Sequence, residues 1–308
     1  MSIFLGDELT EILESIEEGR GYDAKDTVQM KIGVHALPKF PKDNTDRNRT
    51  SPFAFTGNKF EFRMAGSSQS IATANAVLNT AFAEVLRQFS DILEGADNFN
   101  DTLHELIRKT IKDHKRIIFN GNGYEEKWIE EAERRGLANL RTTPEALPHM
   151  LDEKNIQLFS RHGVFSENEM RARLEIQLEN YTKIIHIEAL TMLDMARHDI
   201  LPAASDYCAR IAANAELKAK YGSCEAEKKL LSKLSALTDS FYSNIERLEE
   251  AVKKGEGSIG KADSAMFYKN EVISAMNALR ADGDALEELC DGSVWPFPSY
   301  GDMLFSIK

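Results

Sequence analysis

The apolar residues of the first hundred positions recur with two different periods. Residues 7–18 carry one every three or four positions, which predicts a short helix with Asp7 as its N-cap. Residues 28–34 and 58–64 instead alternate apolar and polar side chains, which predicts strands with one apolar face. Residues 72–93 are rich in Ala, Leu and Val at helical spacing, which predicts a long helix.

Helical spacing dominates from residue 100 to residue 280. Two helices of moderate length come first, separated by the Asn-Gly-Asn-Gly turn at 120–123, and longer ones follow. Pro202 is expected to stop or bend the third helix, because proline lacks a backbone N–H and clashes with the preceding turn. Long helices joined by short breaks are typical of an antiparallel bundle or a helical projection. The predicted helices span 100–116, 125–135, 166–200, 203–221, 224–254 and 261–280.

The pattern divides the chain near residue 120. Residues 1–120 are predicted to form an α+β part with few antiparallel strands, and residues 121–308 to be almost entirely helical. The last stretch, 294–305, is apolar and aromatic and contains two prolines. We therefore expect it to pack back on the helices as an ordered tail without regular helical structure.

Charge and composition exclude several classes of function. A formal net charge of −12 disfavours nucleic acid and anionic membranes as partners, and no apolar run is long enough to span a bilayer. The first residues lack the basic region and cleavage site of a signal peptide, so a cytoplasmic location is expected. The three cysteines are widely spaced and form no Cys-x-x-Cys pair, which argues against a disulfide framework and a zinc site.

One strand face concentrates charge. Lys59, Glu61 and Arg63 alternate with apolar residues and should project from the same side of their strand, while Arg47 and Arg49 precede them in a loop. Guanidinium groups match phosphate and carboxylate geometry, and a carboxylate held among cations stays ionised, so the set suits a magnesium–nucleotide complex. An ordinary solvated salt-bridge ladder explains the same pattern. The pattern alone leaves both interpretations open.

Two other motifs are better explained without function. Asp194 and His198 are four residues apart on a predicted helix and could share a metal, but no further ligand pattern accompanies them, which favours a surface contact. The Asn-Gly-Asn-Gly sequence at 120–123 lacks the Lys-Ser/Thr of a P-loop, which favours a turn.

Several segments resemble the glutamine synthetase family in their order along the chain. All members share an Asn-Arg-Ser/Thr loop, a strand with Glu-x-Arg and a helix with Ala-Asn-x-x-Leu, which match residues 48–50, 61–63 and 74–78 here. Longer segments resemble the C-terminal region of the type III members. These segments are RTTPEALP, RHGVFSENEMRARLEIQLENY, DMARHDILPA and WPFPSYGDMLF, at 141–148, 161–181, 194–203 and 295–305.

The resemblance implies a fold and an activity. Residues 1–120 would be the C-terminal part of the glutamine synthetase catalytic domain, and residues 121–308 the helical C-terminal domain peculiar to type III. The family joins ammonia to glutamate with ATP, through γ-glutamyl phosphate, using Mg²⁺ or Mn²⁺. Its members are cytoplasmic and assemble as homo-oligomeric rings.

The resemblance also implies roles for four residues. Arg49 matches an arginine that contacts nucleotide phosphate and stabilises phosphoryl transfer, and Lys59 lies where the family has a basic residue near ATP. Glu61 matches a metal ligand, and Arg63 matches an arginine that holds glutamate and γ-glutamyl phosphate. The second family arginine, five residues after the first, is replaced here by Ala54, and Arg47 is a candidate substitute.

In the family, an N-terminal domain and most of the metal ligands precede these segments. One carboxylate cannot build a site for two or three metals, so we expect the isolated chain to be inactive without an N-terminal half. The alternative is a non-catalytic assembly or regulatory module that docks on a full-length glutamine synthetase.

Overall fold

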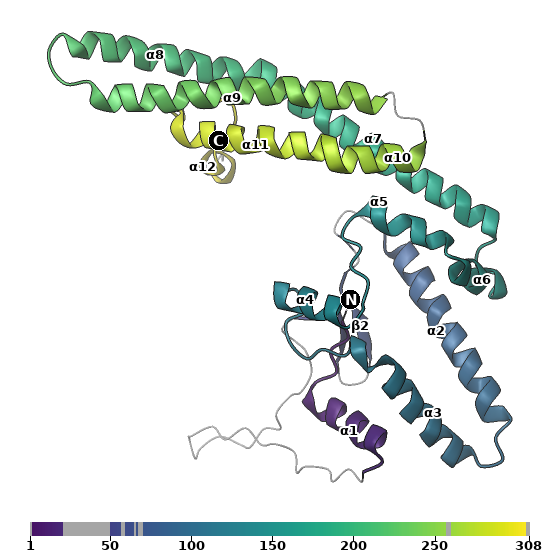
Figure 1. Ribbon diagram of the computed structural model, residues 1–308. Helices are drawn as coiled ribbons and strands as arrows, with labels where there is room; N and C mark the ends of the chain where they lie inside the picture. Colours follow the sequence, from purple (N-terminus) through teal and green to yellow (C-terminus); the bar gives the residue numbers. More distant parts are fainter. Residues whose placement is uncertain are drawn as a thin grey trace, which may run out of the picture. The chain divides into compact units, whose positions relative to one another are not determined.

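A computed structural model describes residues 2–20, 50–56, 59–64, 66, 70–256 and 260–305 (Figure 1). The chain forms two compact units. Unit 1 comprises residues 1–140 and 153–166, and unit 2 comprises residues 141–152 and 167–308. These compact units do not test the boundary between two regions of the chain predicted near residue 120, which stays a prediction. No helix in the described ranges is long and apolar enough to cross a membrane.

Unit 1 combines a two-stranded sheet with helices, as the α+β prediction requires. The predicted helices of this part appear with boundaries within two residues of those expected, because their apolar spacing is regular. The strand predicted at 28–34 lies outside the described residues. The elements of unit 1 are α1 (Asp7–Glu18), β1 (Phe53–Phe55), β2 (Phe60–Phe62), α2 (Ile71–Glu94), α3 (Phe99–His114), the 3-10 turn η1 (Lys115–Ile117), α4 (Glu126–Arg134) and α6 (Glu153–Arg161).

The sheet of unit 1 is an antiparallel hairpin with one aromatic face. Phe53 pairs with Phe62 and Phe55 with Phe60, so the four rings lie on one side, and the Phe53 and Phe60 rings stack at 5.4 Å. Ala54 is fully buried on the other side. Phe60 on this aromatic face is 48% exposed, because no described element of the chain covers it.

The N-terminal segment extends this sheet. Phe4 forms a parallel bridge to Ala54, and Ile3 forms one to Ile118. The Asn120 side chain fixes the segment, since its Oδ1 accepts hydrogen bonds from the backbone N–H groups of Leu5 and Gly6, both at 3.1 Å. The predicted turn at 120–123 is therefore confirmed as a break between helices, and its first residue also holds the start of the chain in place.

Unit 2 is a bundle of long helices. α9 packs along both α8 and α11, and α7 packs against α10 and α9. These contacts confirm the predicted helical extension. Its elements are α5 (Thr143–Ala146), the 3-10 turn η2 (Leu147–Leu151), α7 (Glu167–Met195), the π-helical segment η3 (Ala196–Ile200), α8 (Leu201–Ala219), α9 (Glu225–Glu256), α10 (Lys261–Phe267), the π-helical segment η4 (Tyr268–Val272), α11 (Ile273–Leu289) and α12 (Tyr300–Leu304).

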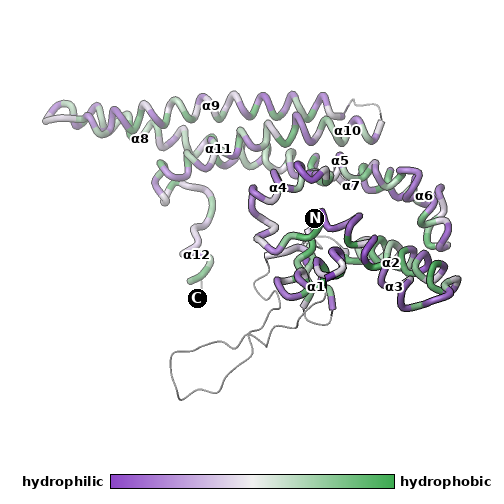
Figure 2. Tube along the Cα trace, turned by 60° about the horizontal axis from the view of Figure 1, so that its bottom comes forward, coloured by the Kyte–Doolittle hydropathy of each residue, from purple (hydrophilic) through white to green (hydrophobic). Residues whose placement is uncertain are grey.

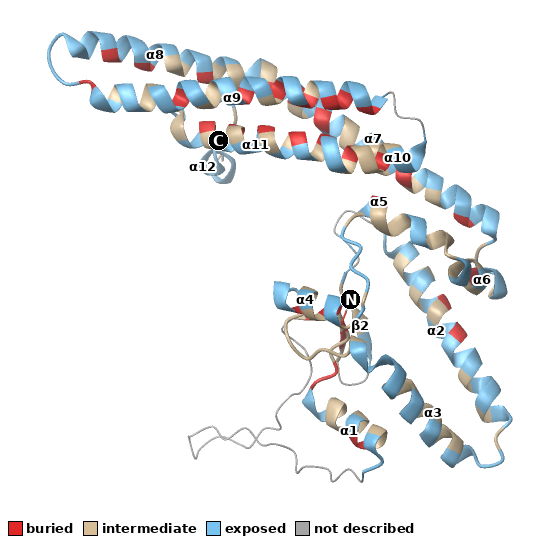
Figure 3. Ribbon diagram, in the orientation of Figure 1, coloured by how far each residue is buried: buried red, intermediate tan, exposed pale blue. Residues whose placement is uncertain are grey.

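The core of unit 2 runs along α9 and α11, where buried residues recur on the facing sides of the two helices (Figure 3). Their apolar residues follow helical spacing, so one stripe of each helix is removed from water. The apolar stripe on α9 therefore makes a contact between helices. The largest fully buried side chains of the stripe are Leu234, Phe241, Ile245 and Leu248 on α9 and Leu279 and Leu286 on α11.

Two predictions about unit 2 need correction. The stop that was one of the two outcomes predicted at Pro202 is not observed, because helical structure continues from α7 through η3 into α8, and the bend stays a prediction. A π-helical segment directly before a proline adds a residue to the turn, which relieves the loss of the proline N–H and its clash with the preceding turn. The tail is also partly helical, because Ser299 and Asp302 form a capping box that starts α12.

Helix α2 of unit 1 is apolar yet poorly covered. Figure 2 shows hydrophobic residues along most of its length, whereas Figure 3 shows few buried positions on it. Its two buried residues are Thr80 and Glu84, both polar, while Phe82 is 64% exposed. Large apolar residues exposed on one helix are typical of a surface that another protein segment covers. The others on α2 are Ile71, Val77, Val85, Leu86 and Ile92.

Candidate functional site

Strand β2 brings Lys59, Glu61 and Arg63 together, as the alternation predicts. Glu61 lies between the two cations: Lys59 Nζ is 3.5 Å from Glu61 Oε1, and Arg63 Nη2 donates a hydrogen bond of 3.2 Å to Glu61 Oε2. The hairpin ladder fixes this register, because the Arg63 N–H donates to the Pro52 carbonyl oxygen at 2.7 Å. The three charges therefore form one cluster, which we call the β2 cluster.

The three side chains of the β2 cluster differ in their exposure to solvent. The Arg63 side chain is 15% exposed, whereas those of Glu61 and Lys59 are 40% and 66% exposed. The hydrogen bond from Arg63 lowers the pKa of Glu61, and Lys59 adds to this effect. Glu61 is therefore a carboxylate at neutral pH with its charge already balanced. An anion such as phosphate would compete with Glu61 for the two cations.

The β2 cluster does not fit a metal ion by itself. A hard divalent cation takes six or more oxygen ligands, several of them carboxylates, whereas the neighbours of Glu61 are two cations. No group of three His, Cys, Asp or Glu side chains that could hold a metal occurs within the described part of the chain. Ligands from another polypeptide segment would have to displace Lys59 or Arg63 from Glu61.

Arg47 and Arg49 lie outside the described residues. The structure therefore places three of the four predicted site residues, namely Lys59, Glu61 and Arg63, and their catalytic, nucleotide and metal roles stay predictions. Ala54, which replaces the second family arginine, is fully buried opposite Glu61 in the hairpin. An arginine at Ala54 would have to bury its charge there, which is costly without a partner.

A second charged cluster of unit 1 surrounds Glu84 on α2 and was not predicted from the sequence. Arg87 Nη2 and Gln88 Nε2 each donate to Glu84 at 2.9 Å from the same helix. Arg161, at the end of α6, donates to Glu84 Oε1, and His162 Nε2 lies 2.8 Å from Glu84 Oε2. These hydrogen bonds hold the pKa of Glu84 well below its usual range.

The Glu84 cluster ties helix α2 to the end of α6. The only signal for it in the sequence is the charged position of Glu84 within an apolar helix, since Arg161 and His162 are more than seventy residues away. A carboxylate with four donors in a dry position is a strong structural contact. It has no free lone pair directed to a ligand, so we assign it a structural role.

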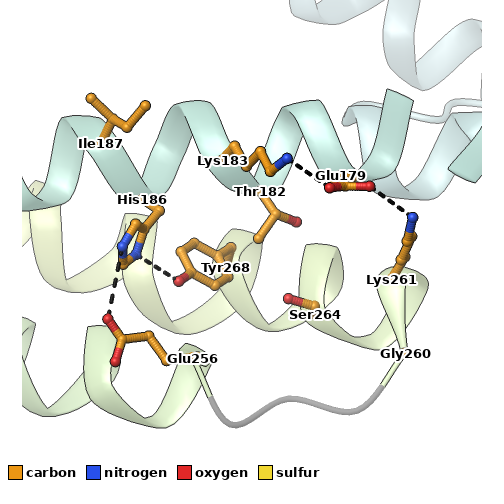
Figure 4. A pocket seen from close by; sticks show the side chains of 11 residues that line it. Glu179, Thr182, Lys183, His186, Ile187, Glu256, Gly260, Lys261, Ser264 and Tyr268 are labelled. Atoms are coloured by element: carbon orange, nitrogen blue, oxygen red, sulfur yellow. Dashed lines mark hydrogen bonds and ion pairs between the residues drawn. The ribbon is translucent and has the colours of Figure 1, made fainter. Parts of the chain in front are cut away.

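A pocket of about 650 Å³ opens in unit 2 between α7, the end of α9 and α10 (Figure 4). His186 Nδ1 lies 2.9 Å from the hydroxyl of Tyr268, and His186 Nε2 lies 3.8 Å from Glu256. Burial raises the pKa of Tyr268, and the charge of Glu256 adds to the effect. Tyr268 therefore stays a neutral phenol that can donate to His186.

The other end of this pocket carries two lysines that share one carboxylate. Lys183 and Lys261 each lie 2.7 Å from Glu179, from α7 and α10 respectively. Their hydrogen bonds lower the pKa of Glu179 to about 2. Both lysines thus share one carboxylate, and this shared ion pair explains how α10 is held against α7.

The Asp194–His198 pair is a surface contact. The distance between His198 Nδ1 and Asp194 Oδ1 is 2.8 Å, and both side chains are more than 70% exposed. No third metal ligand accompanies them in the described ranges.

Comparisons with known proteins connect this chain to one family. Residues 102–219 match the model of the glutamine synthetase C-terminal domain. The chain is 37% identical over 316 residues to a glutamine synthetase of Butyrivibrio fibrisolvens, an alignment that covers 100% of the chain and 44% of that protein. It is 38% identical over 317 residues to the Type-3 glutamine synthetase of Dictyostelium discoideum, covering 99% of the chain and 43% of that protein.

A third relative has the same extent. The chain is 33% identical over 320 residues to a glutamine synthetase of Bacteroides fragilis, covering 99% of the chain and 44% of the relative. The chain thus spans less than half the length of the curated relatives that it matches. The domain match and these similarities along the whole chain show that it belongs to the glutamine synthetase family and corresponds to the C-terminal part of the type III members.

Proposed function

We propose that this chain is the C-terminal part of a glutamate–ammonia ligase that makes glutamine with ATP through γ-glutamyl phosphate. The observation that carries the proposal is the similarity of the whole chain to three glutamine synthetases. Glutamate and ammonia would be the substrates, and ATP with Mg²⁺ or Mn²⁺ would supply the phosphoryl group. A cytoplasmic homo-oligomeric ring, as in the family, is part of the same proposal.

The β2 cluster would supply cations to the reaction. Arg63, the least exposed of the three, would hold the carboxylate or acyl phosphate of the substrate, and Lys59, the most exposed, would meet nucleotide phosphate. Arg49 would act beside them on phosphate. Fixed cations that neutralise developing charge are the main source of catalysis in phosphoryl transfer.

Glu61 would play its metal-binding role only in the complete enzyme. In this chain it holds Lys59 and Arg63 in one place, which prepares both for an anion. Glu61 would help to hold a metal only beside carboxylate ligands of the N-terminal half, and the metal would supply positive charge for the phosphoryl group. The β2 cluster alone does not fit a metal ion, because the side chains paired with Glu61 are both cations.

The exposed apolar surfaces of unit 1 support the proposal that an N-terminal half belongs here. Phe60 on the aromatic face of the hairpin and the apolar residues of α2 are exposed to water. Exposed apolar area of this kind is rare on a self-sufficient domain. We infer that the N-terminal half would cover them and complete the sheet at β2, whose outer edge has no partner among the described strands.

Glutamine formation tests the proposal. The purified chain is assayed with glutamate, ammonia and magnesium–ATP, alone and after co-expression with the N-terminal half of the Butyrivibrio fibrisolvens relative. We expect turnover only in the combined sample. Arg63→Lys should lower kcat/KM by about 100-fold there, because a lysine cannot replace a forked guanidinium contact, whereas the exposed Glu105→Gln should leave it unchanged.

Two outcomes would contradict the proposal. Turnover by the chain alone that disappears in Glu61→Ala would show a self-contained site and refute the expected inactivity. A stable complex with the N-terminal half that never turns over would instead favour the alternative, a helical module that docks on glutamine synthetase without doing chemistry.

A further inference from the structure

An apolar groove in unit 2 has no role in the proposed reaction. It lies between α7, α9 and α11, which pack against one another, and encloses about 550 Å³. This volume lies within the usual range of small-molecule sites, roughly 300–1,000 Å³. Its floor is apolar and includes Phe241 and Leu279, both from the core of the bundle.

Two features of its wall make the groove more than a gap between helices. The π-helical segment η3 contributes Ala196 and Ile200 to its wall, and such segments occur often at functional sites. Three methionines line it, and methionine side chains adapt readily to different ligand shapes. They are Met192, Met195 and Met276.

The C-terminal tail closes one side of the groove. Trp295 and Phe297 line it, and their rings meet edge to face at 6.3 Å. Backbone hydrogen bonds to the Asp291 carbonyl oxygen from Val294 and Trp295 hold this part of the tail. The prediction that the tail packs back on the helices is therefore correct for Trp295, which contacts the core of unit 2.

Trp295 also presents an unused hydrogen-bond donor. Its Nε1 is buried and has no hydrogen-bond partner among the described residues. A buried donor without an acceptor destabilises a fold by about 1–3 kcal/mol. Trp295 is therefore held beside the groove by apolar contacts and by its backbone hydrogen bond, not by its indole N–H.

The rim of the groove selects against anions. Its exposed charged residues are Glu188, Asp284 and Glu287 against one cation, Arg280, whose Nε already donates to Asp284 at 2.6 Å. The rim therefore carries an excess of negative charge. A negatively charged head group would be repelled at the entrance.

We propose that this groove binds a small uncharged molecule with an apolar body. The apolar floor removes the body from water, the methionines adapt to its shape, and the acidic rim excludes carboxylates of equal size. The site is independent of the β2 cluster and of the ligase reaction.

Binding of 1-octanol, with octanoate as the anionic counterpart, tests this inference. The sequence has two tryptophans, so Trp128→Phe leaves Trp295 as the sole fluorescent reporter. We expect a saturable change of Trp295 fluorescence with 1-octanol and at least about tenfold weaker binding of octanoate because of the rim charge. Calorimetry on the unsubstituted chain gives the same comparison if Trp128→Phe perturbs unit 1, where Trp128 is buried.

A matched pair of variants on α11 locates the site. Gly283 lines the groove, and Gly283→Leu would fill it, whereas Ala281 is exposed on the same helix and does not line it. Gly283→Leu should abolish 1-octanol binding and Ala281→Leu should leave it intact. Met195→Arg, at a position 37% exposed, blocks the groove from α7 without disturbing the core.

Three results would overturn the inference. They are the absence of saturable 1-octanol binding, equal affinity for octanoate, and undiminished binding in both Gly283→Leu and Met195→Arg.

Discussion

The ring of Tyr268 occupies the place where a side chain on Gly255 would begin. A Cβ atom added to Gly255 would lie 2.7 Å from Tyr268 Cε2 and 3.0 Å from its hydroxyl oxygen. Gly255 is in the last turn of α9, and Tyr268 starts η4, so the contact joins two helices of unit 2 at close range. The Tyr268 side chain cannot easily change its rotamer, because it is 2% exposed and its hydroxyl is hydrogen-bonded to His186.

Gly255→Ala should destabilise unit 2. Overpacking of a fixed ring costs about 1–3 kcal/mol, which exceeds the roughly 1 kcal/mol that alanine gains over glycine in a helix. Urea unfolding followed by circular dichroism measures the change. Gly222→Ala is the matched control, since a Cβ there meets nothing within 4 Å. Equal stability of both variants would show that Tyr268 moves more easily than its contacts indicate.

Truncation of Leu234 should test the assignment of the unit 2 core. Leu234 is fully buried on α9, and Leu234→Ala should lower the free energy of unfolding by about 2–5 kcal/mol through lost burial and the cavity left behind. Lys233→Ala changes the neighbouring exposed position and should alter stability by less than about 0.5 kcal/mol. Similar losses in both variants would mean that α9 does not present this stripe to a core.

Asn120 should matter for the order of the N-terminal segment. Asn120→Ala would leave the N–H groups of Leu5 and Gly6 without their acceptor, a change expected to cost about 1–3 kcal/mol. Asn120→Asp keeps an acceptor but loses the N–H that donates to Thr10 Oγ1 at 2.8 Å, so its effect should be intermediate. Amide hydrogen exchange at Leu5 and Gly6 provides the readout. Unchanged protection in Asn120→Ala would contradict this role.

Sequence periodicity was sufficient for the helices but not for the contacts between distant residues. The helix predicted at 72–93 is observed at Ile71–Glu94, because its spacing and composition are local properties. The alternation of Lys59, Glu61 and Arg63 likewise predicts their shared face, since the period of a strand is two. In contrast, Glu84 meets Arg161 across seventy-seven positions, and no local pattern encodes that distance.

Errors in the sequence reasoning have physical causes as well. The helix does not end at Pro202, because the π-helical segment η3 takes up an extra residue before it, and π-helical turns leave no clear trace in apolar spacing. The exposure of Phe60 did not follow from the sequence, because alternation shows which side of a strand is apolar, not whether another element covers that side. The groove beside Trp295 was missed because the tail reaches it only through the tertiary fold.

Glu84 should make unit 1 sensitive to acid. Its pKa is lower in the folded chain than the usual value of about 4.3 for an unfolded glutamate, because Arg87, Gln88 and His162 bond to its charged form. A depressed pKa contributes stability that is fully present above the unfolded pKa and is lost as the pH falls toward the folded pKa. Unit 1 should therefore lose stability progressively below about pH 4.3.

Fluorescence of Trp128, which is buried in unit 1, follows this transition if Trp295→Phe removes the second tryptophan. Glu84→Gln should lower stability at pH 7, because a neutral amide cannot accept charge-assisted bonds from Arg87 and Arg161. The same variant should flatten the dependence of stability on pH below about 4.3, since it has no proton to gain there. Glu105→Gln, on exposed α3, should keep the original dependence. An acid transition that is unchanged in Glu84→Gln would assign it to other carboxylates of unit 1, such as Glu131, whose pKa is lowered to about 2 by Arg134 and Arg135.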